Sequence, residues 1–257
     1  MSAAPGRSQA SSHRSPQGEG TPVSSGPPPM KQMALDIGLA PVPTLDNFVA
    51  AGNEAALEHL RLWVGNPLRS PVPTFLWGEG GSGKTHLLRA VREALRDHGG
   101  QVGWLDAATL HPPEYDEHWQ VVLLDDCHLY TAGQQAAAFN WFVNAQTPAH
   151  GPARWVLAAA DRPPADLLLR EDLRTRLGWG HVFQLKALSE AERRAVLRRA
   201  ADERGVFLGD EVMDFMLTRF ARDLSSLMLL LGQLDAYALR TQRAITIPLI
   251  KSMLENE

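Results

Sequence analysis

The sequence has a single cysteine, no long apolar run and no surplus of basic residues. Cys127 alone cannot form a disulfide within the chain, which excludes a secreted disulfide scaffold. The longest apolar run, Trp155–Ala160, has six residues, far fewer than the roughly 20 that a membrane-spanning helix needs. The N-terminus also lacks the apolar segment of a signal peptide. We therefore expect a cytoplasmic protein with no membrane contact.

The charge balance restricts the function further. Lys and Arg number 25 and Asp and Glu 29, which gives a net charge of −4. Proteins that bind nucleic acid on their own normally carry an excess of positive charge matched to the phosphates. This balance argues against a stand-alone nucleic-acid binder.

The first thirty residues differ in composition from the rest of the chain. Ser, Pro and Gly occupy 17 of these positions. Such a segment cannot bury enough apolar surface to offset the entropy lost on ordering. We therefore expect residues 1–30 to be a disordered tail.

Short apolar runs alternate with helical patterns through residues 41–185. This alternation is typical of an α/β fold with a mostly parallel sheet flanked by helices. Several of the runs are apolar on consecutive residues, as in strands that are covered on both faces. The predicted strands are Thr74–Trp77, Gln101–Leu105, Gln120–Leu124, Arg154–Ala160 and His181–Leu185, and the predicted helices are Lys84–Asp97, Gln134–Ala145 and Ala165–Leu177.

Residues 186–257 contain helical patterns without strands. Ser189 and Glu192 have the spacing of a capping box for a helix that runs to Gly205. Further helices are predicted over Asp210–Phe220, Asp223–Arg243 and Ile245–Leu254. We expect a small C-terminal helical lobe after the α/β lobe.

The strongest motif follows the first predicted strand and opens a helix, as a phosphate-binding P-loop does. Its glycines let backbone N–H groups surround phosphate oxygens, and the helix N-terminus favours negative charge. Lys84 is expected to reach the β and γ phosphates, and the Thr85 hydroxyl to bind Mg²⁺. The alternative is a glycine-rich turn before a lysine. The residues predicted to bind the nucleotide are Gly78, Gly80, Gly81, Ser82, Gly83, Lys84 and Thr85.

Acidic residues follow two of the predicted strands. Asp125 and Asp126 end the strand over 120–124, and we predict Asp125 as the second Mg²⁺ ligand. Asp126 is a candidate general base that orients an attacking water. Asp161 ends the strand over 154–160 and is placed to face the nucleotide's γ-phosphate. The alternatives are a helix-capping pair for the first two and a turn residue for Asp161.

Taken together, these motifs resemble the AAA+ family of replication initiators. The resemblance includes Thr-His-Leu-Leu after the P-loop lysine, Leu-Leu-Asp-Asp, Ala-Asp-Arg-Pro-Pro, and the segments Thr44–Val49, Arg174–Gly180 and Ala244–Pro248. It implies an AAA+ P-loop NTPase with a helical lid, which binds ADP or ATP with Mg²⁺. It also implies that Arg176 is an arginine finger acting on ATP held by a neighbouring subunit. We interpret Arg174 as a surface ion pair and Trp179 as a packing anchor.

Within that family the chain is most similar to the short Hda-type regulators. The sequence ends at Glu257 without the helix-turn-helix domain of an initiator, and residues 31–40 contain a segment similar to a sliding-clamp-binding peptide. In that segment Gln32 would hydrogen-bond at the pocket rim, while Met33, Leu35 and Ile37 would supply apolar anchors. A stray apolar stretch is the alternative.

The resemblance implies a negative regulator of replication initiation. Such a protein docks on the sliding clamp (the β subunit of the polymerase) and stimulates ATP hydrolysis by the DnaA-type initiator. It would be cytoplasmic and associated with the nucleoid or replisome, would reach DNA only through its partners, and would also self-associate.

One position departs from the family pattern. Ser225 occupies the place of a lid arginine that contacts the nucleotide's terminal phosphate in these proteins. We therefore expect weak discrimination between ATP and ADP and slow intrinsic ATP hydrolysis.

Two other functions fit parts of the sequence. A DNA-bound AAA+ adaptor or loader would show salt-dependent affinity for duplex DNA, and a P-loop kinase would phosphorylate a small metabolite.

Overall fold

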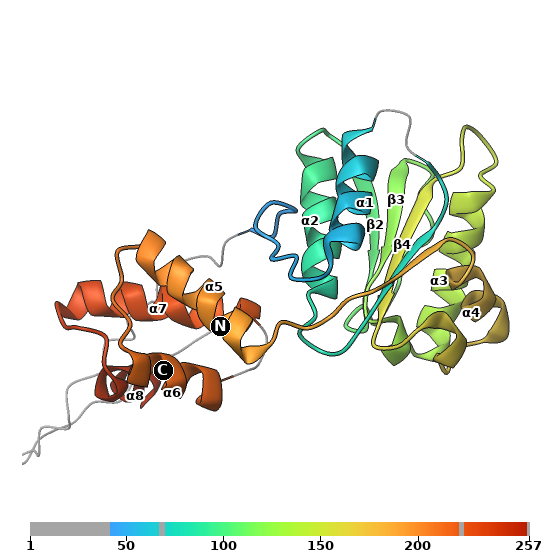
Figure 1. The fold of residues 1–257 in the computed structure, drawn as a ribbon. Coiled ribbons are helices and arrows are strands. Elements are labelled where there is room, and N and C mark those ends of the chain that lie inside the picture. Colours follow the sequence, from blue (N-terminus) through green and yellow to red (C-terminus); the bar gives the residue numbers. More distant parts are fainter. Residues whose placement is uncertain (1–41, 67–69, 221–223, 256–257) are drawn as a thin grey trace, which may run out of the picture. The chain divides into compact units, whose positions relative to one another are not determined.

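The computed structural model describes residues 42–66, 70–220 and 224–255. The predicted tail (1–30) and the segment 31–40 with Gln32, Met33, Leu35 and Ile37 lie outside these ranges. Within them the chain forms a five-stranded sheet with flanking helices, followed by a helical segment (Figure 1). The α/β class expected from the sequence is confirmed.

All five predicted strands are present to within one residue at each end. They are β1 (Thr74–Trp77), β2 (Gln101–Leu105), β3 (Trp119–Leu124), β4 (Trp155–Ala160) and β5 (His181–Gln184). Every neighbouring pair is parallel, in the order β2-β3-β4-β1-β5. The strand before the P-loop therefore lies between β4 and β5. In open parallel sheets, ligands bind outside the carboxyl ends of the strands.

Helices cover both faces of the sheet. Helices α1 (Glu54–Gly65) and α2 (Lys84–Arg96) pack on one face, and α3 (Ala132–Gln146) and α4 (Glu171–Leu177) pack on the other (Figure 1). Successive strand residues point to opposite faces. Leu76 and Leu123 accordingly join the first core, while Phe75 and Val122 join the second. Because both faces are covered, these strands are apolar at consecutive positions.

Helix α1 is absent from the sequence-based prediction. Its buried residues Ala56, Leu57, Leu60 and Trp63 nevertheless have the spacing of one helical face. The ring of Trp63 stacks on that of Trp155 in β4, with their centroids 3.7 Å apart. This contact ties α1 to the sheet.

The predicted helix Ala165–Leu177 is wrong in its first half. The chain forms a short 3₁₀ helix, η2 (Pro164–Asp166), and becomes helical again only at Glu171. Between them Leu167 and Leu169 are buried while Leu168 is 93% exposed. This alternation belongs to an extended chain, in which neighbouring side chains point in opposite directions. The three-leucine run therefore packs as extended chain.

The C-terminal helices form a core of their own. They are α5 (Glu190–Glu203), α6 (Asp210–Arg219), α7 (Leu224–Thr241) and α8 (Ile247–Glu255). The predicted capping box is present, since Ser189 Oγ accepts from the backbone of Glu192 and the Glu192 carboxylate accepts from the backbone of Ser189. Gly205 has φ +68° just after the helix that it was predicted to end.

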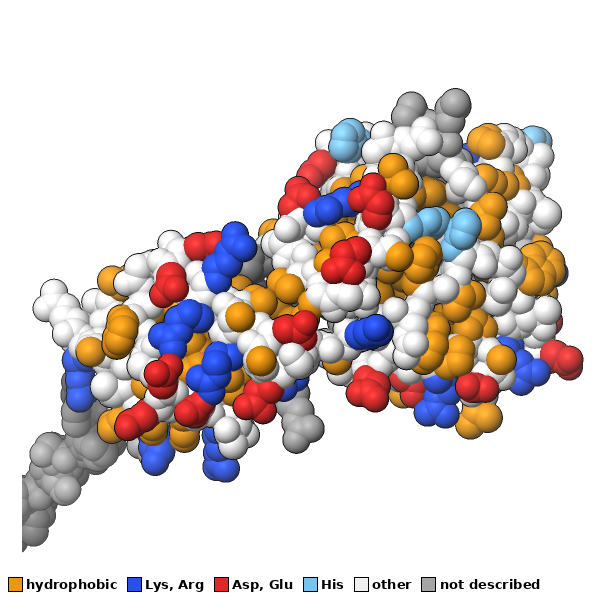
Figure 2. All heavy atoms as spheres, viewed as in Figure 1, with side chains coloured by type: hydrophobic (Ala, Val, Ile, Leu, Met, Phe, Trp, Pro, Cys, Tyr) orange, Lys and Arg blue, Asp and Glu red, His pale blue; other side chains and the backbone are white. Residues whose placement is uncertain are grey.

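Basic and acidic side chains alternate over this helical segment (Figure 2). Arg198 pairs with Asp210 at 2.6 Å, Arg199 pairs with Glu203 at 2.8 Å, and Arg194 pairs with Asp214. Local carboxylates therefore balance the charge of these three arginines. In the part of the chain that the structure describes, none of the helices is long and apolar enough to cross a membrane.

Candidate nucleotide site

The P-loop turns sharply between β1 and α2, and geometry constrains three of its glycines, including Gly81, whose φ is +79°. A Cβ atom on Gly78 would lie 2.2 Å from the carbonyl oxygen of Leu185. Gly83 has φ +90°, a conformation that strongly favours glycine, and a Cβ there would lie 2.6 Å from Cε2 of Phe48. Gly80 has open space around it. Backbone geometry thus constrains Gly78, Gly81 and Gly83, while Gly80 has open space beside it.

The start of α2 has the properties of an anion-binding site. Its N-cap is Gly83, which makes no side-chain cap, and its first turn contains no acidic residue. The first N–H groups of a helix have no partner within the helix, and the helix dipole favours negative charge there. Phosphate oxygens would satisfy these donors.

Lys84 lies inside the loop and is only 7% exposed. Its Nζ donates to the carbonyl oxygens of Gly78 at 2.8 Å and Glu79 at 3.0 Å. Burial lowers the pKa of Lys84, and the nearby carboxylates of Asp126, Asp125 and Asp161 oppose that shift. Lys84 therefore lies near three acids at this end of the sheet.

Asp125 and Asp126 lie at the end of β3 in different environments. Asp125 is 2% exposed, and burial raises its pKa, while the Thr85 side chain is close enough to oppose that shift. Asp126 has φ +50°, an uncommon conformation for a residue other than glycine. Such strain occurs preferentially at functional sites.

These residues fit a magnesium-nucleotide complex. Within the described ranges, no group of three or more His, Cys, Asp or Glu side chains is arranged to hold a metal. Mg²⁺ usually binds one or two protein oxygens and takes its other ligands from phosphates and water. Thr85 and Asp125 supply that number of protein oxygens, so the metal would bind together with the nucleotide.

Asp161 follows β4 next to the acids of β3. It pairs with Arg162 at 2.9 Å, and the Arg162 hydrogen bonds lower the pKa of Asp161. Nδ1 of His128 lies 3.9 Å from the same carboxylate. Asp161 is therefore held by a neighbouring arginine, near enough to Lys84 to act on its pKa but not in the lining of the cavity.

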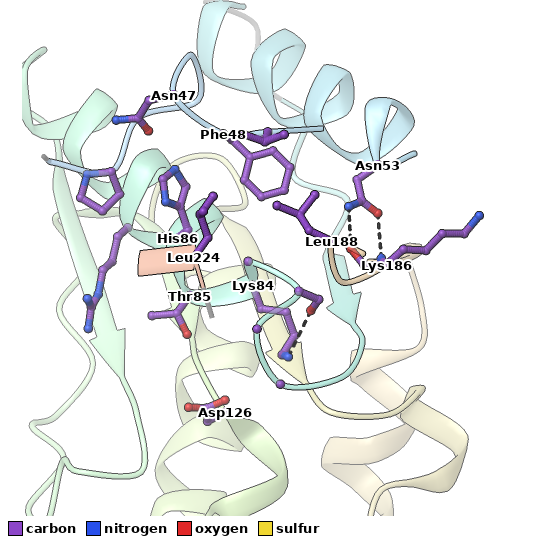
Figure 3. A pocket seen from close by; sticks show the side chains of 17 residues that line it. Asn47, Phe48, Asn53, Lys84, Thr85, His86, Asp126, Lys186, Leu188 and Leu224 are labelled. Carbon is purple, nitrogen blue, oxygen red and sulfur yellow. Dashed lines mark hydrogen bonds between the residues drawn. The ribbon is translucent and has the colours of Figure 1, made fainter. Parts of the chain in front are cut away.

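A cavity of about 420 Å³ runs along the P-loop. Figure 3 shows Phe48 and Leu188 at one end, Asp126 at the other, and Lys84 and Thr85 between them. An apolar end beside a phosphate-binding loop matches the two halves of a nucleotide, base and phosphates. The lining residues are Pro43, Asn47, Phe48, Val49, Asn53, Gly80, Gly81, Ser82, Gly83, Lys84, Thr85, His86, Arg89, Asp126, Lys186, Leu188 and Leu224.

The cavity also contains residues that sequence reasoning missed. The Asn53 amide donates to the carbonyl oxygen of Lys186 at 3.0 Å and accepts from the Lys186 N–H at 2.8 Å (Figure 3). These hydrogen bonds join the start of α1 to the segment after β5. No local pattern marks Asn53, because its partner lies 133 residues away. Asn47, Phe48 and Val49, which the sequence analysis connected with the family resemblance, do line the cavity.

Arg176 lies on α4 and does not line this cavity. Its Cζ is 5.3 Å from the ring centre of Phe139 and 5.1 Å from that of Trp179. The interpretation of Trp179 as a packing anchor is wrong, since it is 62% exposed. The neighbouring Gly180 makes the close packing contact, because a Cβ there would lie 1.8 Å from the carbonyl oxygen of Pro73. Arg174 makes no ion pair with the described residues, contrary to expectation.

Comparison with known proteins agrees with this architecture. The family model described as the lid domain of Hda matches residues 190–254, and that of the bacterial DnaA ATPase domain matches residues 39–109. A Haemophilus influenzae protein described as uncharacterized is 35% identical over 235 residues, which is 87% of this chain and 98% of that protein.

Solved structures are similar in fold. Domain III of the Thermotoga maritima replication initiation protein DnaA matches with a TM-score of 0.65 and 22% identity, over 84% of this chain and 97% of that one. AMPPCP-bound DnaA from Aquifex aeolicus matches with a TM-score of 0.58 and 24% identity, over 79% and 67% of the two chains.

The parallel sheet with a P-loop after its interior strand β1, the helical lid and these similarities lead to one assignment. The chain belongs to the DnaA-like AAA+ proteins, and within them it is of the Hda type.

Proposed function

We propose that this protein is a negative regulator of replication initiation that stimulates ATP hydrolysis by a DnaA-type initiator. It holds ADP or ATP with Mg²⁺ in its own cavity and acts through Arg176 on ATP bound by the initiator. We further propose that it docks on the sliding clamp through Gln32, Met33, Leu35 and Ile37. It would work in the cytoplasm at the replisome.

The position of Arg176 is the observation that carries this proposal. The side chain is partly exposed and lies outside the cavity of its own chain. Within the described residues it makes no ion pair. An arginine that serves another subunit's nucleotide needs an accessible guanidinium whose charge is not neutralised, because it must stabilise charge on the transferring phosphoryl group.

The protein's own nucleotide has a different role in this proposal. Mg²⁺, bound with the nucleotide, would neutralise phosphate charge beside Thr85 and Asp125. Lys84 would give up its carbonyl contacts and donate to the phosphate oxygens. Asp126 is the candidate for orienting a water. Helix α7 has Ser225 where related lids have an arginine, and we propose that intrinsic hydrolysis is therefore slow.

Direct DNA binding is less well supported. The net charge is −4, and several lid arginines are paired with carboxylates. A surface that binds DNA by charge needs cations that are available to the phosphates. Affinity for plain duplex DNA that falls steeply with salt would favour the adaptor or loader alternative.

The decisive experiment measures hydrolysis of initiator-bound ATP in the presence of DNA-loaded clamp. It compares the wild type with Arg176→Ala, Gln32→Ala/Leu35→Ala, and Arg174→Ala as the matched control on the same helix. Removing an arginine finger costs about 10³–10⁵ in rate in other systems, so we expect Arg176→Ala to return hydrolysis to the initiator's basal rate. The double variant should fail to stimulate hydrolysis under conditions in which stimulation depends on the clamp. Arg174→Ala should behave as wild type. Equal stimulation by all four proteins would overturn both the finger and the clamp assignments.

A further inference from the structure

The side chain of Arg176 contacts two aromatic rings. Its Cζ is 5.3 Å from the ring centre of Phe139 on α3 and 5.1 Å from that of Trp179 after α4. Both distances are within the range of about 6 Å over which a guanidinium is attracted to an aromatic face. The guanidinium is therefore in contact with rings from two different elements.

The neighbouring Arg170 provides an internal comparison. Its Cζ also lies over Phe139, at 4.8 Å, but its guanidinium donates to the carboxylate of Asp172 at 2.7 Å. A carboxylate therefore balances the charge of Arg170, whereas no carboxylate among the described residues pairs with Arg176. Two arginines that share one ring thus differ in whether a carboxylate competes with an incoming phosphate.

The backbone holds Trp179 beside Arg176. The Trp179 N–H donates to the carbonyl oxygen of Arg176 at 3.1 Å. The next residue, Gly180, packs directly on the backbone of Pro73, where a Cβ atom could not fit. The indole ring is 62% exposed. Its position is therefore set by the Gly-Trp-Gly backbone, while its face remains available to a side chain.

We propose that Phe139 and Trp179 are positioning residues that hold the Arg176 guanidinium extended and charged for phosphate held by another chain. This inference rests on the proposed role of Arg176. Aromatic faces restrict the rotamers of an arginine without neutralising it, so less conformational entropy is lost when the partner binds. The contacts are also weaker than charge-assisted hydrogen bonds to phosphate oxygens, which can therefore replace them.

The first test concerns the free protein. The Nε–H NMR signal of Arg176, assigned by its loss in Arg176→Ala, should be shifted upfield by the rings. Trp179→Leu should move the signal toward the position of an unrestrained arginine, and Trp179→Phe should retain much of the shift. A signal that is already unshifted in the wild type would overturn the inference, whatever the function of Arg176.

The second test measures stimulated ATP hydrolysis against protein concentration. Trp179→Leu should lower the maximal rate about five-fold, which corresponds to about 1 kcal/mol, and leave the half-saturating concentration unchanged. Trp179→Phe should recover most of the rate. In the Arg176→Ala background Trp179→Leu should have no further effect, because both changes act on one interaction.

The outcomes separate this inference from the proposed function. Unchanged stimulation by Arg176→Ala would overturn the finger itself. Lost stimulation by Arg176→Ala with a full maximal rate for Trp179→Leu would overturn only the positioning role. A higher half-saturating concentration at an unchanged maximal rate for Trp179→Leu would show that Trp179 is a docking contact. That result would also overturn the positioning role. Phe139→Leu, with its unfolding midpoint measured, tests the second ring independently.

Discussion

At the scale of single residues, burial sets the protonation of several side chains. Cys127 is fully buried, and burial raises the pKa of its thiol to about 12. Its Sγ donates to the carbonyl oxygen of Leu124 at 3.4 Å. The thiol therefore stays protonated at neutral pH and acts as a small buried apolar group beside the acids of β3.

His59 makes the stability of the fold sensitive to acid. Its Nε2 lies 2.9 Å from Oγ1 of Thr74, which also accepts from the indole N–H of Trp155. Burial lowers the pKa of His59, and the nearby His181 acts in the same direction. Between this lowered pKa and the unfolded value of about 6.5, the unfolded chain binds more protons. The contribution of His59 to the free energy of unfolding is therefore complete above about pH 6.5. It is lost as the pH falls through the lowered pKa of the folded state.

We expect the substitution His59→Gln to flatten part of this pH dependence. Urea unfolding at pH 5.0, 6.0 and 7.5 should show a smaller loss of stability on acidification than in the wild type. His98→Gln, at an exposed histidine after α2, controls for removal of an imidazole. An identical acid-dependent loss in wild type and His59→Gln would contradict this account.

At the scale of elements, a close backbone contact positions the edge of the sheet. Strand β5 pairs with β1 from Thr74 opposite His181 onward. Just before this pairing, the His181 N–H donates to the carbonyl oxygen of Pro73 at 2.9 Å. Gly180 lies against the same carbonyl. The Gly-Trp-Gly segment thus determines where β5 starts as well as where Trp179 lies.

The substitution Gly180→Ala should separate β5 from β1 at this point. The added Cβ would meet backbone atoms, which cannot move as a flexible side chain can, so we expect a loss of about 1–3 kcal/mol in the free energy of unfolding. Gly133→Ala in α3, where nothing lies within 4 Å of the added atom, is the matched control and should stabilise by up to about 1 kcal/mol. Denaturant unfolding measures both, and equal effects would show that the Pro73 contact is unimportant.

At the scale of the whole molecule, the cavity brings together segments from across the sequence. Its lining extends from Pro43 through the P-loop and Asp126 to Lys186 and Leu224. A ligand that contacts all of these segments in the folded state, and none of them in the unfolded state, must stabilise the fold by mass action.

We therefore expect ADP with Mg²⁺ to raise the unfolding midpoint of the intact chain. A nucleotide concentration 100 times its dissociation constant should contribute about 2.7 kcal/mol. Lys84→Ala should abolish most of this effect, whereas Lys251→Ala, at an exposed lysine of α8, should retain it. Calorimetry with and without nucleotide provides the measurement. A full nucleotide effect in Lys84→Ala would remove the P-loop from the binding site.

Local patterns predicted most of the fold. The strands were found to within one residue because their apolar runs are short, continuous and bounded by turns. The prediction over Ala165–Leu177 failed in its first half, because a leucine run does not distinguish a helix from an extended chain that buries alternate side chains. Helix α1 was missed although Leu57, Leu60 and Trp63 have helical spacing.

The sequence was sufficient to locate the P-loop, the acids after β3 and β4, and the helical lid. Each of these depends on spacing within a few residues, and the covalent chain itself maintains that spacing. The Asn53–Lys186 hydrogen bonds, the contact of Gly180 with Pro73 and the rings around Arg176 became visible only in the folded chain. These contacts join segments whose distance depends on how helices pack on the sheet, and no local pattern of residues encodes that distance.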